Sequence, residues 1–170
     1  MNRSSPGQPE NDPNFKRFAE ARAFQVTLHI TTIAYATLCQ HAEKAYPDEC
    51  CGVLLGKVAD DERHVHRIIP CRNIRVGEAD KRYEIDLTEL VRVQREARES
   101  GMEILGFYHS HPDHPAHPSP TDLEHAHWIG CSYVITSVER GKATETRSFL
   151  LRGTREEDKS FVEERLTYPN

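Results

Sequence analysis

The sequence lacks several features that mark whole classes of protein. No apolar run reaches the roughly 18 residues of a membrane-spanning helix, and the first residues hold no apolar segment like that of a secretory signal. Acidic residues outnumber basic ones, 27 to 22, so the formal net charge is -5. This balance argues against a general nucleic-acid binder. We therefore expect a soluble protein whose partners include neither nucleic acid nor a membrane.

Cysteine usage is also limited. The five cysteines are odd in number and form no Cys-x-x-Cys pair; they are Cys39, Cys50, Cys51, Cys71 and Cys131. Without a secretory signal, this pattern predicts reduced thiols in a cytoplasmic protein. Most such cysteines serve as small buried hydrophobic residues.

The length of 170 residues suits one domain with tails. Residues 1–21 are rich in proline, asparagine, serine and glycine, which is typical of a disordered leader. We expect the folded domain to span residues 22–153. Residues 154–170 are expected to form an acidic C-terminal tail or a helix.

Hydrophobic periodicity predicts a mixture of strands and helices. Strands are expected at 24–30, 50–56, 63–71, 102–111, 131–139 and 144–153, and helices at 31–46, from Ser119 onward and at 154–166. The last two strands read as a hairpin. Strands and helices alternate loosely and neighbouring strands are hairpin-linked, which favours a mixed α/β layer over an all-parallel sheet.

One further helix is expected between the third and fourth strands. Residues 83–100 read as a brief strand followed by this helix. Its apolar positions predict an inward face made of Leu87, Leu90, Val91 and Val93. Gly101 follows as a C-terminal cap.

The most unusual stretch runs from Gly106 to His127, with six histidines, four prolines and three acids. His109 and His111 stand one residue apart at the end of a predicted strand. Strand side chains alternate, so both imidazoles should point to one face with their Cα atoms about 7 Å apart. Two imidazoles at that separation can converge on one cation. Catalytic zinc typically takes three protein ligands, so a third is needed.

Asp122 is the leading candidate for the third ligand. It follows His111 by eleven residues, across a loop that four prolines stiffen. Ser119 and Asp122 also read as a helix start, in which Asp122 only completes a capping box. Both roles are compatible, because a carboxylate has two oxygens. The remaining histidines of the stretch are expected at the surface or around the ligands; they are His114, His117, His125 and His127.

These residues resemble a known motif. The pattern H-x-H-P, six residues, S-x-x-D is similar to the JAMM motif of MPN-domain metallopeptidases, and it runs from His109 to Asp122 without a gap. That family also carries an upstream glutamate before a glycine-containing apolar run, and Glu49 in "PDECCGVLLGK" matches this position. The resemblance covers about Phe24 to Gly153.

The resemblance implies an α/β fold of the MPN type, a curved mixed β-sheet flanked by helices. It implies zinc bound by His109, His111 and Asp122, with water in the fourth position. Glu49 would be the general base that takes the proton of this water, and Ser119 would donate a hydrogen bond to the developing oxyanion. Without the resemblance, Glu49 reads as a solvated turn acid and Ser119 as a helix cap.

Within the family, the short chain resembles the compact prokaryotic members, notably in "RYEID" and "GFYHSHPDHPAHPS". Those are associated with ubiquitin-like sulfur-carrier proteins, which they cleave after the C-terminal Gly-Gly. The polar connection Arg72–Asp86 is expected to pair with such an extended tail as an added strand. Its basic residues, Arg72, Arg75, Lys81 and Arg82, would attract an acidic carrier. The sequence leaves the oligomeric state open.

Three other interpretations remain. The first is a thiol hydrolase with Cys50 or Cys51 as nucleophile and a histidine as base. The second is a non-enzymatic module whose histidines store or sense metal. The third is an interaction scaffold that keeps the fold without turnover.

Overall fold

A computed structural model describes residues 27–74 and 83–169 of the chain. The elements are β1 (Thr27–Ile30), α2 (Thr32–Ala45), β2 (Cys51–Ala59), β3 (Glu62–Cys71), α3 (Leu87–Glu99), β4 (Glu103–Pro112), α4 (Pro120–His125), β5 (Ser132–Glu139), β6 (Lys142–Arg152), the short 3-10 helix η2 (Glu156–Asp158) and β7 (Ser160–Thr167). The predicted leader, 1–21, and the basic residues Arg75, Lys81 and Arg82 lie outside the described residues. No helix in the described part is long and apolar enough to cross a membrane.

The sheet is mixed, as expected, but it closes on itself. The strand order is β1-β3-β2-β4-β5-β6-β7, and β1 pairs with β7 to complete a barrel. The pairs β1–β3, β1–β7 and β4–β5 are parallel, and the others are antiparallel. The sequence predicts a curved mixed sheet, and the structure adds its closure into a barrel. Closure pairs backbone groups that the edge strands would otherwise leave exposed.

The C-terminal segment causes this closure, and the helix predicted at 154–166 is wrong. After η2 the chain extends as β7, which pairs with β6 on one side and with β1 on the other. Phe161 packs against one apolar cluster and Leu166 packs against another. The two faces of β7 therefore contact different clusters. Backbone pairing with two neighbouring strands outweighs the local helical tendency of the segment.

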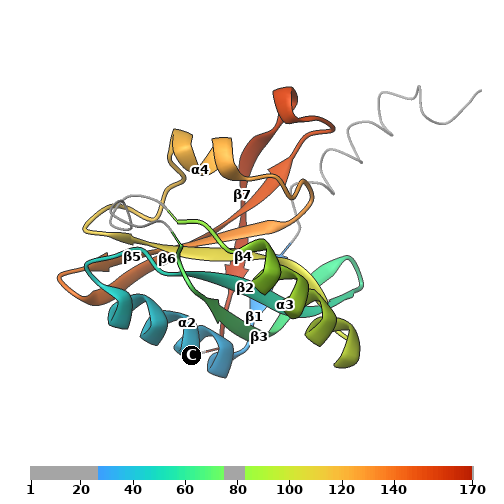
Figure 1. Cartoon of the computed structure of the whole chain (residues 1–170), viewed down its shortest axis with the longest axis horizontal. Helices are drawn as coiled ribbons and strands as arrows, with labels where there is room; N and C mark the ends of the chain where they lie inside the picture. The colour runs from blue at the N-terminus through green and yellow to red at the C-terminus, as the bar shows by residue number, and fades with distance from the viewer. Residues whose placement is uncertain (1–26, 75–82, 170) are drawn as a thin grey trace, which may run out of the picture.

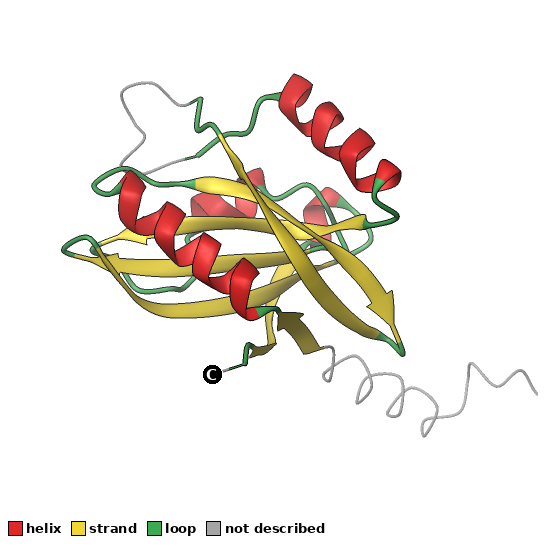
Figure 2. Ribbon diagram, turned by 90° about the horizontal axis from the view of Figure 1, so that it is seen from below, coloured by secondary structure: helices red, strands yellow, loops and turns green. Residues whose placement is uncertain are grey.

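Two helices cover opposite faces of the central strands, and Figures 1 and 2 show them outside the sheet. The cluster under α2 contains Leu54 and Tyr108, whereas the cluster under α3 contains Val53 and Phe107. These are neighbouring positions on β2 and β4, as the alternation of strand side chains requires. Helix α2 begins after Thr31, whose hydroxyl accepts the backbone N–H of Ala34.

Helix α3 turns only part of the predicted face to the sheet, because Leu90 and Val93 lie inward as predicted whereas two other positions do not. Val93 and Ala97 are buried and Leu90 is partly buried, but Leu87 is 79% exposed and Val91 is 58% exposed. The contact with the sheet is a narrow stripe at positions three and four apart, which leaves the other apolar positions on the solvent side. Gly101 ends this helix with a φ of +63°, as predicted.

The register between β2 and β4 positions the candidate site. The backbone N–H of Ser110 donates to the carbonyl of Cys50 at 3.1 Å, and the N–H of Cys50 donates to the hydroxyl of Ser110 at 2.9 Å. Because the strands are antiparallel, the residue before Cys50 faces the residue after Ser110. Glu49 is thereby placed opposite His111.

Strands β4 and β5 approach each other so closely at Gly106 that a larger side chain has no room. A Cβ atom at this position would lie 1.9 Å from the backbone oxygen of Ser132, which cannot move without breaking the pairing of the two strands. We expect Gly106→Ala to lower the free energy of unfolding by about 1–3 kcal/mol or more, as measured by urea denaturation.

Gly101→Asn is the matched control for this substitution. Its Cβ meets nothing within 4 Å, and asparagine tolerates the left-handed backbone conformation. A stability of Gly106→Ala equal to that of the control would contradict this packing of β4 against β5.

Candidate metal centre

The three residues predicted as metal ligands come together. His109 and His111 stand at the end of β4, and Asp122 lies in the first turn of α4. The Nε2 atoms of the two imidazoles are 3.0 Å apart. The Oδ1 atom of Asp122 is 3.2 Å from Nε2 of His109, and its Oδ2 atom is 3.4 Å from Nε2 of His111.

These separations fit a zinc ion. Tetrahedral zinc with bonds of about 2.0–2.1 Å to nitrogen and oxygen places neighbouring ligand atoms about 3.3–3.4 Å apart. The two Nε2 atoms are 3.0 Å apart and Oδ1 of Asp122 is 3.2 Å from Nε2 of His109, both close to that edge length. One ligand atom from each of the three residues lies within 4.8 Å of the others. Two imidazoles and one carboxylate are also a known donor set for catalytic zinc. The residues present therefore fit the cation that the motif implies.

The two imidazoles are oriented in different ways. Nδ1 of His111 lies 2.8 Å from the carbonyl oxygen of Pro115, and a carbonyl only accepts, so Nδ1 carries the proton and Nε2 offers its lone pair. Nδ1 of His109 is buried and has no hydrogen-bond partner among residues 27–74 and 83–169. Its ring instead stacks on Tyr83, with centroids 4.5 Å apart and an interplanar angle of 25°.

Burial and mutual contact set the charges of the site. Burial lowers the pKa of His109, which favours the neutral form that binds metals. Burial opposes ionisation of Asp122, but hydrogen bonds with His109 and His111 outweigh it and hold the pKa of this carboxyl well below its usual range. Burial likewise opposes protonation of His111, yet the contact with Asp122 raises the pKa of this imidazole. The centre thus presents an ionised carboxylate to any cation.

Ser119 and Asp122 form the predicted capping box. The Ser119 hydroxyl accepts the N–H of Asp122 at 3.1 Å, and the N–H of Ser119 donates to Oδ2 of Asp122 at 2.6 Å. The same carboxylate faces both imidazoles, so the capping and metal-facing positions of Asp122 coexist. The role of Ser119 as a helix cap is therefore confirmed.

Glu49 does not lie in solvent. It is only 7% exposed and stands just before β2, where the side-chain amide of Asn73 donates to its carbonyl at 3.3 Å. The negative charge of Glu49 contributes to raising the pKa of both His111 and Tyr83. A buried carboxylate opposite His111 is suitably placed for proton transfer beside the centre. The interpretation as a solvated turn acid is wrong.

The other histidines of the stretch lie outside the cluster. His114, His117, His125 and His127 are all exposed, which agrees with the expected surface position. His125 and His127 border a pocket described below.

The cysteines are poorly suited to nucleophilic catalysis. All five are free thiols, and Cys50 and Cys51 are both buried. Burial raises the pKa of Cys50 to about 11 and that of Cys51 well above its usual value. Because the thiolate is the nucleophile, neither side chain would be ionised near neutral pH. This geometry argues against the thiol hydrolase.

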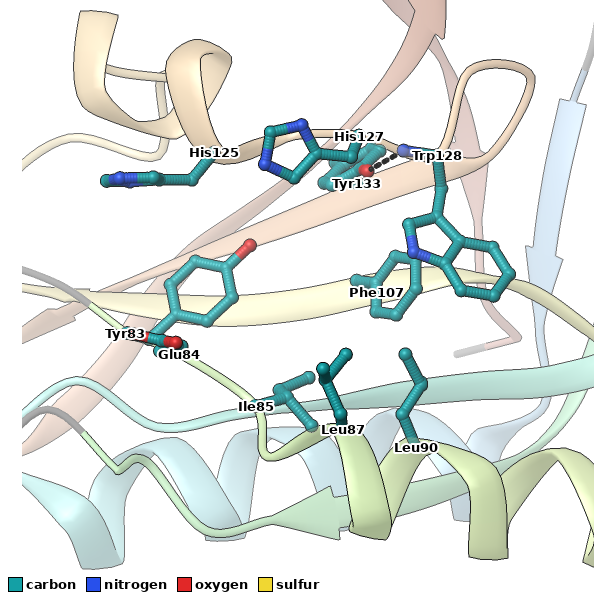
Figure 3. Close-up of a pocket in the computed structure, with 10 residues that line it drawn as sticks. All are labelled: Tyr83, Glu84, Ile85, Leu87, Leu90, Phe107, His125, His127, Trp128 and Tyr133. Atoms are coloured by element: carbon teal, nitrogen blue, oxygen red, sulfur yellow. Dashed lines mark hydrogen bonds between the residues drawn. The ribbon is translucent and has the colours of Figure 1, made fainter.

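An apolar pocket of about 310 Å³ adjoins the centre (Figure 3). It is lined by Tyr83, Glu84, Ile85, Leu87, Leu90, Phe107, His125, His127, Trp128 and Tyr133. Two of these residues connect it to the metal cluster, because Tyr83 stacks on His109 and Phe107 precedes His109 by two positions on the same strand face. In Figure 3 the apolar side chains Ile85, Leu87 and Leu90 face His125 at the end of α4 and His127 just after it.

Sequence reasoning assigned no role to this pocket. Its residues come from four separate segments, so no local spacing connects them. Two signals were present: Tyr83 stands in the "RYEID" stretch that carries part of the resemblance, and Trp128 is the single tryptophan of the chain. The exposed side chain of Leu87 lines this pocket.

Comparisons with known proteins agree with the geometry. A desampylase from Haloferax volcanii is 41% identical over 91 residues, which cover 54% of this chain and 63% of that protein. The CysO-cysteine peptidase of Mycobacterium tuberculosis is 33% identical over 109 residues, covering 64% of this chain and 72% of that protein. A probable TtuB-protein conjugate cleaving protease from Thermus thermophilus is 32% identical over 111 residues, covering 65% and 67% of the two chains.

The fold has solved counterparts. A solution structure from Desulfitobacterium hafniense superposes with a TM-score of 0.72 at 31% identity, covering 84% of this chain and 92% of the other. The family model described as prokaryotic homologs of the JAB domain matches residues 31–152, a range that holds Glu49 and the whole cluster. The chain therefore belongs to the prokaryotic JAB-domain family, the compact prokaryotic branch of the JAMM/MPN proteins.

Proposed function

We propose that the protein is a zinc-dependent peptidase or isopeptidase that hydrolyses the bond after the C-terminal Gly-Gly of a ubiquitin-like sulfur-carrier protein. The observation that carries this proposal is the preformed triangle of His109, His111 and Asp122 with a buried Glu49 opposite His111. Relatives named as a desampylase, a CysO-cysteine peptidase and a probable TtuB-protein conjugate cleaving protease support the substrate class.

Each residue has a separate task in this proposal. Zinc, when bound, supplies a Lewis acid that polarises the scissile carbonyl and acidifies a water molecule. Glu49 accepts the proton of the attacking water and returns it to the leaving amine. Ser119 accepts one hydrogen bond at the helix start, which leaves its own hydroxyl proton to donate to the developing oxyanion.

The surroundings suit an extended tail that ends in glycine. Tyr83 stacks directly on His109, so its aromatic ring forms one wall of the centre and narrows the space beside it. Residues without a Cβ pass such a wall most easily, which favours Gly-Gly at the scissile bond. The adjoining pocket has an apolar side formed by Ile85, Leu87 and Leu90, which suits an apolar side chain earlier in the tail.

The non-enzymatic interpretations make different demands on the site. A metal store needs several ligand groups of similar strength and no buried base, whereas a scaffold needs neither zinc nor Glu49. The burial of Glu49 beside the triangle favours an enzyme, and the first two predictions below together separate the three interpretations.

The first prediction concerns zinc. His111→Ala removes one of only three protein ligands, so we expect zinc affinity at this centre to fall by at least about 100-fold, because even outer hydrogen-bond partners are worth about 10–100-fold. Bound zinc per chain, measured by elemental analysis after dialysis against a competing chelator, should drop by one equivalent.

His117→Ala is the control, because His117 is exposed on the same loop and lies outside the cluster. It should retain wild-type zinc content. Full zinc in the His111→Ala protein would remove the centre as described.

The second prediction concerns the base. Glu49→Gln is nearly isosteric but cannot accept a proton, so we expect turnover to fall about 10²–10⁴-fold while the zinc content stays unchanged. The neighbouring Asp48→Asn changes an exposed acid and should keep wild-type turnover. Equal rates for the two variants would show that Glu49 takes no part in proton transfer.

The third prediction concerns the substrate. A sulfur carrier extended by a few residues beyond Gly-Gly should lose the extension when incubated with the zinc-loaded protein, whereas an Ala-Ala version of the same carrier should stay intact. Intact-mass spectrometry measures both. Cleavage of both carriers to the same extent, or of neither, would contradict the proposed Gly-Gly specificity.

A further inference from the structure

A second cluster of metal-binding side chains lies elsewhere on the barrel. His29 on β1 and Glu62 and His64 on β3 bring one ligand atom each within 4.8 Å of one another. His29 pairs with His64 across the parallel β1–β3 ladder, and Glu62 precedes His64 by two residues on the same strand face. The proposed function does not use these residues.

This cluster is remote from the first centre. Along β3, His64 stands seven residues before Cys71, which pairs with Cys51, which in turn pairs with His109. At about 3.3 Å per residue the two groups are about 20 Å apart along the sheet. A cation bound at one centre therefore shares no ligand with the other.

We propose that His29, Glu62 and His64 form a second site for zinc or a similar divalent cation. The donor set matches that of the first centre, two imidazoles and one carboxylate, which is suited to zinc among the common metals. The inference is independent of the peptidase activity.

The hydrogen bonds of His29 support this assignment. Its Nε2 atom lies 2.9 Å from Oε2 of Glu62, and its Nδ1 atom lies 2.7 Å from the hydroxyl of Thr167 on β7. Metal-binding histidines typically hold one ring nitrogen toward the ion while an oxygen accepts from the other. Thr167 gives His29 this arrangement, as the Pro115 carbonyl does for His111 in the first centre.

The second site must contract to close around an ion. Its imidazoles are stacked at an interplanar angle of 10°, and its ligand atoms lie within 4.8 Å of one another, whereas a tetrahedral ion needs ligand atoms about 3.3–3.4 Å apart. The side chains have room to rotate, because His29 is 33% exposed and Glu62 is 46% exposed. Rotation and solvent exposure make this site weaker than the preformed triangle.

A cation bound at the second site would link β1 to β3, two strands that are distant in the sequence. Strand β1 has four residues, and its partners are β3 and the C-terminal β7. An ion held by β1 and β3 binds the folded state only, so it stabilises the barrel at this seam by mass action. At a free zinc concentration 100 times the dissociation constant, the equilibrium constant of unfolding should fall about 100-fold.

The test uses the full-length chain in which His111→Ala removes the first centre. Titration with zinc alone, followed by isothermal calorimetry, should give one equivalent bound per chain, and zinc should raise the thermal midpoint of unfolding. Adding His29→Ala should abolish both effects. Adding His66→Ala in place of His29→Ala should preserve both, because His66 lies on the same strand but outside the cluster.

A second variant guards against effects of His111→Ala on folding. In the otherwise unchanged protein, Glu62→Gln should lower the zinc stoichiometry from two to one and leave carrier cleavage unchanged. A single equivalent of zinc in both the unchanged protein and the Glu62→Gln variant would overturn the second site. Two equivalents in both would overturn the assignment to these three residues.

Discussion

The candidate site depends on the carboxylate of Asp122. This group accepts a backbone hydrogen bond at the start of α4 and simultaneously faces His109 and His111, so one side chain joins a helix end to a strand end. Without it, two buried imidazoles would lie 3.0 Å apart with no negative charge between them. The cost of burying this carboxylate is offset by three polar neighbours at hydrogen-bonding distance or close to it, the two imidazoles and the backbone N–H of Ser119. The capping box is therefore part of the site.

The sheet supplies the second constraint. The mutual hydrogen bonds of Cys50 and Ser110 set the register that places Glu49 opposite His111. A slip of one residue would turn both histidines to the opposite face of β4 and move the glutamate out of reach. The close approach of β4 and β5 at Gly106 holds the strand that carries the histidines. The chemistry at the centre thus depends on strand pairing as well as on the capped helix that carries Asp122.

Local sequence rules predicted the parts of the site that are local. Alternation along a strand placed His109 and His111 on one face, and the spacing from Ser119 to Asp122 predicted the capped helix. Glu49 lies sixty residues before His109, so only the family resemblance connected them. The Tyr83 stack and the apolar pocket depend on tertiary contacts that no short pattern encodes.

The incorrect predictions for the C-terminal segment and for α3 also arise from tertiary contacts. Residues 160–167 lie mostly in the helix predicted at 154–166, but they form a strand because β6 and β1 pair with them. Leu87 and Val91 fit an amphipathic helix but point away from the sheet, since the contact stripe of α3 runs through Val93 and Ala97. In both cases partners distant in sequence decided the outcome, which is where tertiary packing overrides local propensity.

The most direct measurement is X-ray absorption at the zinc edge. The sample is the His64→Ala protein loaded with one equivalent of zinc, so that the first centre alone is occupied. The account predicts two imidazole nitrogens with oxygen ligands at about 2.0–2.1 Å and no sulfur. A sulfur ligand at about 2.3 Å, or the absence of imidazole, would contradict binding by His109, His111 and Asp122.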